Sequence, residues 1–253
     1  MEATSFTQQD WEHYAMCYDR LNELTPYRAM LDEVLSVLTP LHAATVLDAA
    51  CGTGNFITRA LGDPSQQASV STFIGCDYST VMLERARSKL PPEALVLRAD
   101  LNRPLPFPVQ HVDVIISINT IYAIEDPAEL IARFAQLLTT NGTLILVTPN
   151  AGYQNGLILK EHCGSTKPDA YWEHVHLSPE IEEARIREAC PDPELAADLI
   201  HVGRFNRLIC ANHRFHFFDK GGLDNIITAA GLEISDHRMT YAGQCHLVIA
   251  HKS

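Results

Sequence analysis

Three aspartates, each at the end of an apolar run, and a pair of glycines could together bind one ligand. Asp48, Asp77 and Asp100 each close such a run, and Gly52 and Gly54 follow the first of them. A carboxylate can accept both hydroxyl groups of a ribose. Glycines let the backbone approach a ligand closely and expose amide groups at the start of the next helix. This combination predicts a pocket for a nucleoside.

The charge near the glycines discriminates between two nucleoside cofactors. A dinucleotide fingerprint counted from Gly52 requires glycine or alanine at position 57, where this chain has Ile57. Asp48 would repel a pyrophosphate but attract an ammonium group. The residues therefore favour S-adenosylmethionine over NAD.

The elements that position these residues alternate between strand-type and helix-type patterns, which favours a parallel sheet with crossover helices. A helix is expected before the first strand, over 27–38. Another begins at Pro127 and is expected to stop at Asn141 and Gly142. The last 30 residues predict a helix and a hairpin that turns at Ala242 and Gly243. The expected strands of the sheet itself are 45–50, 70–77, 94–100, 112–119 and 143–149.

One long segment interrupts this alternation. Residues 150–218 hold several prolines and six of the twelve histidines, and nothing in them completes the sheet. We expect a helical lid over the carboxyl ends of the strands. The predicted organisation is an N-terminal helical cap (1–43), a nucleotide-binding core (44–150), a substrate-binding lid insertion (151–214) and the C-terminal part of the core (215–253).

The glycine turn resembles the first motif of class I (Rossmann-like) S-adenosylmethionine-dependent methyltransferases of the small-molecule, methyltransferase domain 11/25 type. That motif, D-x-G-x-G-x-G, appears as "DAACGTG" from Asp48 to Gly54, with Ala50 where the first glycine is usual. The resemblance covers about 44–150 and resumes over 215–251. It implies an α/β fold with a mostly parallel seven-stranded sheet, an antiparallel C-terminal hairpin and helices on both faces.

The resemblance also implies roles for individual residues. Asp77 would bind the ribose, Asp100 the adenine amine and the Leu101 amide a ring nitrogen. Cys51 is expected to act through its backbone amide. The full implied set for S-adenosylmethionine, or its product S-adenosylhomocysteine, is Tyr14, Tyr18, Asp48, Ala50, Cys51, Gly52, Gly54, Asp77, Tyr78, Met82, Asp100, Leu101 and Asn119.

Candidate catalytic residues lie outside the cofactor motifs. Tyr122 is placed by the resemblance near the transferable methyl group. His174 and His176, in "YWEHVHLSP", are candidate general bases because an imidazole titrates near neutral pH. No further ligand at zinc-type spacing accompanies them, so we expect no metal site.

Composition restricts the partners. The net charge of −12, spread along the chain, argues against a phosphate backbone or an anionic membrane. The sequence "NTIY" after the fourth strand lacks the Asn/Asp-Pro-Pro-Tyr marker of DNA and protein amino-methylating relatives. Without an apolar membrane span or leader, and with seven cysteines but no C-x-x-C pair, a cytoplasmic protein with free thiols is predicted. A homodimer stays open.

The predicted function is methyl transfer to oxygen, nitrogen or carbon of a small molecule, such as a natural-product intermediate. Two alternatives stay open at this point. One is an NAD(P)-dependent oxidoreductase on a related fold. The other is a non-catalytic subunit that binds S-adenosylmethionine while serving a partner, for which Ala50 is the hint.

Overall fold

A computed structural model describes residues 8–64, 70–92, 94–173, 178–211 and 215–253 of the chain. Its centre is a seven-stranded sheet in the order β3-β2-β1-β4-β5-β7-β6. The strands are β1 (Thr45–Ala49), β2 (Thr72–Asp77), β3 (Leu95–Arg98), β4 (Val112–Ile118), β5 (Leu138–Pro149), β6 (Leu232–Thr240) and β7 (Cys245–Lys252).

The sheet is the predicted one. The first five strands pair in parallel, and β7 runs antiparallel between β5 and β6. The predicted hairpin is present, since β6 ends at Thr240 and β7 begins at Cys245. The seven-stranded α/β fold expected from the sequence is therefore confirmed.

One boundary differs from the expectation. The helix α6 ends at Leu137, and β5 begins at Leu138, before the Asn141-Gly142 pair that was expected to stop the helix. Leu138 pairs with Val112 on β4, and the register then shifts before Val114. Asn141 takes a left-handed conformation (φ 63°) within the strand. The Asn141-Gly142 pair therefore lies at an irregularity within β5 and does not end the helix α6.

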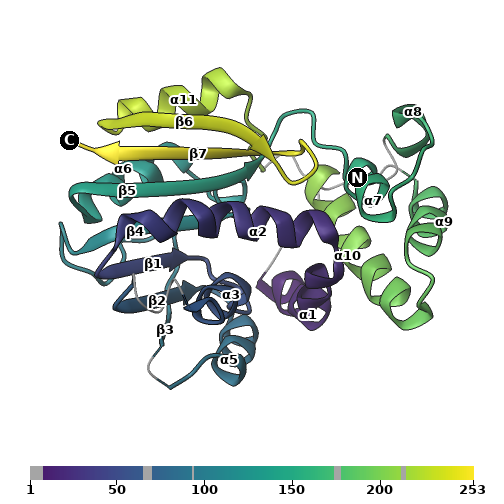
Figure 1. Ribbon diagram of the computed structural model, residues 1–253, viewed down its shortest axis with the longest axis horizontal. Helices are drawn as coiled ribbons and strands as arrows, with labels where there is room; N and C mark the ends of the chain where they lie inside the picture. Colours follow the sequence, from purple (N-terminus) through teal and green to yellow (C-terminus); the bar gives the residue numbers. More distant parts are fainter. Residues whose placement is uncertain (1–7, 65–69, 93, 174–177, 212–214) are drawn as a thin grey trace.

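Alternating side chains of the strands bury two apolar layers, one on each face of the sheet. On β1, Val46 points to one layer and Leu47 to the other. Helices α2 (Thr25–Leu38), α3 (Asn55–Leu61) and α5 (Thr80–Lys89) cover the first face. Helices α6 (Pro127–Leu137) and α11 (Lys220–Ala229) cover the second (Figure 1).

The described part of the segment expected to form a lid folds into helices. These are α7 (Asn155–Cys163), α8 (Asp169–Trp172), α9 (Pro179–Ala189) and α10 (Pro193–Ala211), gathered beyond one end of the sheet in Figure 1. The N-terminal helix α1 (Gln8–Tyr18) packs on α10. Short 3-10 turns complete the chain at Asp19–Glu23, Thr39–Leu41 and Ile121–Ala123. None of the described helices has the length and apolar character that a bilayer span requires.

The lid helices are joined through a buried carboxyl group. Glu182 of α9, 1% exposed, forms an ion pair with Arg207 of α10 and accepts a hydrogen bond from Asn155 Nδ2 of α7 at 3.3 Å. A Cβ at Gly203 would lie 2.6 Å from Glu182 Oε1, so glycine is required for α10 to approach. Burial raises the pKa of Glu182 to about 7.

Candidate functional site

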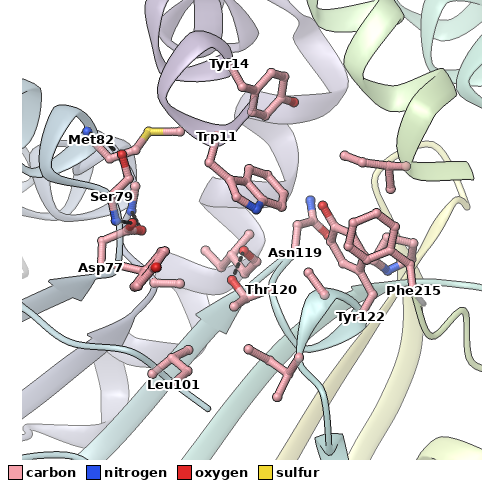
Figure 2. A pocket seen from close by; sticks show the side chains of 18 of the residues that line it. Trp11, Tyr14, Asp77, Ser79, Met82, Leu101, Asn119, Thr120, Tyr122 and Phe215 are labelled. Carbon is pink, nitrogen blue, oxygen red and sulfur yellow. Dashed lines mark hydrogen bonds between the residues drawn. The ribbon is translucent and has the colours of Figure 1, made fainter. Parts of the chain in front are cut away.

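A pocket of about 820 Å³ lies where the predicted ligand site was expected, between the carboxyl ends of the parallel strands and helices α1 and α10. Figure 2 shows two opposite walls of it. One carries Asp77, Ser79 and Met82, and the other carries Asn119, Tyr122 and Phe215, with Trp11 and Tyr14 between them.

The turn after β1 takes the conformation that a glycine-rich motif predicts. Gly52 and Gly54 both have positive φ angles, of 55° and 76°, and so does Ala50, at 63°. Ala50 and Gly52 line the pocket, while Gly54 precedes α3. A Cβ at Gly52 would lie 3.6 Å from Tyr18 Cε1 and would take up part of the space above the turn. The turn therefore offers backbone surface to a ligand.

Asp77 connects this turn to the next strand. Its Oδ2 accepts a hydrogen bond from the Gly52 amide at 2.9 Å, and its Oδ1 accepts one from the Ser79 amide at 2.9 Å. Burial raises the pKa of Asp77 although these hydrogen bonds lower it. Each oxygen keeps a further lone pair, so the side chain can still accept two ribose hydroxyl groups.

Asp48 differs most from its expected role. It is 2% exposed, lies outside the pocket lining, and its Oδ2 has no hydrogen-bond partner among the described residues. Burial, and then the neighbouring Asp77, raise the pKa of Asp48 to about 8. The carboxyl group is therefore mostly protonated at neutral pH, so the negative charge expected of Asp48 is largely absent.

Cys51 and Gly54 also lie outside the lining. The Cys51 amide donates a hydrogen bond to the Cys76 carbonyl at 2.9 Å, and burial raises the pKa of the Cys51 thiol well above its usual value. Both residues shape the turn. A Cβ at Gly54 would lie 3.2 Å from Leu90 Cδ1, which explains why α3 begins with glycine.

The residues predicted to bind adenine lie together at one end of the pocket. Asp100 and Leu101 line the pocket together with Tyr78 and Met82. Asp100 Oδ1 accepts the Asn102 amide at 2.9 Å, which fixes the loop after β3. The Met82 amide donates to the Ser79 hydroxyl at 3.2 Å, so Ser79 caps the N-terminus of α5.

Asn119 and Tyr122 lie on the opposite wall. Asn119 has a left-handed backbone (φ 51°), its amide donates to the Val147 carbonyl at 2.8 Å, and its Oδ1 accepts from Cys245 Sγ at 3.5 Å. Tyr122 is buried, and burial raises the pKa of its phenol. Both residues face the pocket at the end of β4, where the sequence placed them.

Helix α1 forms one wall along the pocket. Tyr14 and Tyr18 both line it, with ring centroids 5.2 Å apart. Tyr14 also packs on Phe205 of α10, at 5.2 Å between centroids. Beyond the end of α1, the Arg20 side chain pairs with Asp198 of α10 at 2.7 Å. The N-terminal segment is thus attached to the lid.

Several lining residues were not predicted from the sequence. They lie at the end away from Asp77 or on the N-terminal helix, and most are aromatic. His216 is one of them, and its backbone amide donates to the Tyr122 carbonyl at 2.7 Å. Only the alternating "RFHFF" run gave a sequence signal for any of these. They are Trp11, Tyr27, Tyr153, Asn206, Phe215, His216, Phe217 and Tyr241.

The two histidines predicted as general bases, His174 and His176, lie outside the described residues. Their role stays a prediction.

The comparisons with known proteins agree with this geometry. Residues 47–146 match the family model of a methyltransferase domain. A tRNA U34 carboxymethyltransferase of Shewanella woodyi is 27% identical over 145 residues, which are 55% of this chain and 42% of that protein. The match thus spans less than half the length of that relative.

Two solved structures share the fold at low identity. One is the methyltransferase in complex with the Haloferax volcanii Trm112 methyltransferase activator, with a TM-score of 0.62, 16% identity, and coverage of 96% of this chain and 97% of that chain. The other is magnesium protoporphyrin IX methyltransferase from Synechocystis with bound S-adenosylhomocysteine, with a TM-score of 0.56, 17% identity, and coverage of 92% and 86%.

Proposed function

Because residues 47–146 form a methyltransferase domain on the class I, Rossmann-like fold of S-adenosylmethionine-dependent enzymes, we propose that this chain transfers a methyl group from S-adenosylmethionine to a small molecule. The observation that carries the proposal is one continuous pocket. It reaches from Asp77 and Asp100 to the aromatic end under the lid. Its volume of about 820 Å³ lies within the roughly 300–1,000 Å³ range of small-molecule sites.

The residues at the Asp77 end fit the cofactor. Gly52 leaves backbone surface open, Asp77 retains free lone pairs for the ribose, and the Asp48 carboxyl has an oxygen without a partner. S-adenosylmethionine supplies an activated methyl group bonded to a sulfonium. The work left to the protein is to orient the acceptor, exclude water and accept a proton where the acceptor loses one.

A small acceptor is favoured over tRNA by the charges around the pocket. The described lining contains no lysine or arginine. Cations of the lid are paired with carboxylates: Arg187 and Arg204 with Glu183, and Arg207 with Glu182. Because nucleic-acid binding relies on unpaired cations facing phosphates, these pairs and the net charge of −12 argue against it.

The same lining favours a methyl over a carboxymethyl group. A carboxymethyl donor would place a carboxylate near Asn119 and Tyr122, where the described lining holds no cationic side chain to pair with it. Burying an unpaired carboxylate is strongly unfavourable. The relative from Shewanella woodyi therefore serves as a guide to the fold and the cofactor end.

The first experiment measures thermal shifts with S-adenosylhomocysteine, NAD and NADP. We expect stabilisation by S-adenosylhomocysteine alone, and a preference for a dinucleotide would contradict the proposal. The protein is then incubated with isotope-labelled methyl donor and either a metabolite extract or total tRNA. Label should enter small molecules. Label found on tRNA would overturn the small-molecule proposal, and binding without any label transfer would favour a non-catalytic subunit.

A further inference from the structure

We call the part of the pocket around Tyr122, Phe215 and Phe217, away from Asp77, the acceptor end. We infer that it takes an amine, whose nitrogen receives the methyl group. This inference rests on the proposed function and narrows it, because oxygen, nitrogen and carbon acceptors are all open to a methyltransferase of this fold. Three features of the pocket lead to it: its aromatic walls, the sign of its charged groups and its effect on protons.

Aromatic side chains form most of the acceptor end. The Tyr122 ring stacks on Phe217 with centroids 6.0 Å apart and meets Phe215 edge-on at 5.6 Å. The ring centroids of Tyr153 and Phe217 lie 6.3 Å apart. Tyr27, also in the lining, packs edge-on against Tyr241 with ring centroids 6.2 Å apart. The faces of such rings attract cations within about 6 Å, so this surface would draw an alkylammonium group from water.

The charged side chains of the described lining all have one sign. They are Asp77, Asp100 and Glu125, and they lie toward the nucleoside end. An acceptor with a carboxylate or phosphate would find no described lysine or arginine to pair with, and it would be repelled along the pocket. An amine carries the opposite charge in solution, so the same field assists its entry.

The pocket's own tyrosines show what it does to a bound hydroxyl group. Burial raises the pKa of six of the tyrosine phenols that line it: Tyr14, Tyr18, Tyr27, Tyr122, Tyr153 and Tyr241. A phenol acceptor in these surroundings would likewise be held in its neutral, weakly nucleophilic form. The effect on an ammonium group is the reverse, since burial favours its neutral free base, which has the reactive lone pair.

The ammonium group gives up one proton to water as it becomes buried, so the transfer needs no general base from the protein. The neutral amine nitrogen donates its lone pair to the methyl carbon and forms the nitrogen–carbon bond. The carbon–sulfur bond breaks with its electron pair going to sulfur, which becomes the thioether of S-adenosylhomocysteine. For a primary or secondary amine, one nitrogen-bound proton leaves to water. Tyr122 and Asn119 orient the nitrogen from the wall opposite Asp77.

The test uses the whole chain, an isotope-labelled methyl donor and a metabolite extract, and reads the products by NMR correlation of the labelled methyl group. Methyl groups on nitrogen, oxygen and carbon resonate at distinct positions. We expect the N-methyl signal. An O-methyl or C-methyl signal would overturn the amine inference and leave the small-molecule methyltransferase intact. Label only on tRNA, or none despite S-adenosylhomocysteine binding, would overturn both.

A matched pair of variants tests the aromatic wall. Tyr122→Phe keeps the ring but removes the hydroxyl group that helps to orient the nitrogen, and we expect a smaller loss of N-methyl product than for Tyr122→Leu. Tyr122→Leu removes the ring face, and we expect about a tenfold loss at low acceptor concentration, in keeping with one cation–π contact. Both should bind S-adenosylhomocysteine equally well. Equal activity of the two variants would contradict the role assigned to the ring.

Discussion

Binding of S-adenosylhomocysteine should release a proton from Asp48. A carboxyl group with a pKa of about 8 is about nine-tenths protonated at pH 7 and half protonated at pH 8. The amino group of the ligand's amino-acid tail carries a positive charge at neutral pH. If this group lies against the turn above Asp48, its charge lowers the pKa of the carboxyl and the proton leaves.

Isothermal titration calorimetry measures the release, because the apparent enthalpy then depends on the ionisation enthalpy of the buffer. The slope of the apparent binding enthalpy against the ionisation enthalpy of the buffer gives the number of protons released. From a pKa of about 8, we expect about 0.9 proton at pH 7, about 0.5 at pH 8 and nearly none at pH 9. Asp48→Asn is the control, since it keeps the shape and cannot lose this proton. A wild-type slope equal to that of Asp48→Asn at each pH would refute the reasoning.

The same group gives a pH dependence of stability. The pKa of Asp48 is raised from 3.8 in the reference state to about 8, so its contribution to stability is fully present below about pH 4 and is lost as the pH rises through 8. At about 1.4 kcal/mol for each pKa unit, the loss is on the order of 6 kcal/mol. Denaturant unfolding of the ligand-free protein should therefore show Asp48→Asn gaining stability relative to wild type between pH 5 and 8.

Three further substitutions test the surrounding structure. Asp77→Asn should weaken S-adenosylhomocysteine binding by about 1.5–3 kcal/mol, because a charge-assisted acceptor for the ribose is lost. The matched control is Asp126→Asn, which changes a helix cap outside the pocket. Equal affinities of the two variants would contradict the ribose assignment. Gly203→Ala should destabilise the protein by about 1–3 kcal/mol, because its Cβ would lie 2.6 Å from the buried Glu182 carboxyl. An unchanged melting temperature would show that Glu182 and helix α10 can shift to make room for the methyl group. Ala50→Gly should stabilise the protein by about 1 kcal/mol, because Ala50 has a φ of 63° that glycine adopts without strain. Denaturant unfolding measures this gain, and a loss of stability would show that the turn carries no strain.

The sequence predicted the fold, and it predicted that Gly52, Asp77 and Asp100 share one site, because both inferences depend on local patterns. Apolar runs of strand length, each ended by an aspartate, located β1, β2 and β3, and the positions of Gly52 and Asp77 followed from the strand ends. The state of Asp48 was not predictable, because its pKa depends on burial that only the packed structure reveals.

The acceptor end could not be read from the sequence for a different reason. Its side chains come from segments far apart in the chain: Trp11 from α1, Tyr153 after β5, Asn206 from α10 and Tyr241 from the β6–β7 turn. No spacing rule links residues of such distant elements, and single aromatic residues in helices resemble ordinary core residues. Only folding brings them to one cavity.

Helix α1 contributes Trp11, Tyr14 and Tyr18 to a pocket that must admit two reactants. The same helix packs on α10, and Arg20 just beyond it pairs with Asp198. Donor and acceptor would both lie against this one helix, so we expect their exchange to be coupled in time. We expect an ordered kinetic scheme in which the donor enters first and its demethylated form departs last.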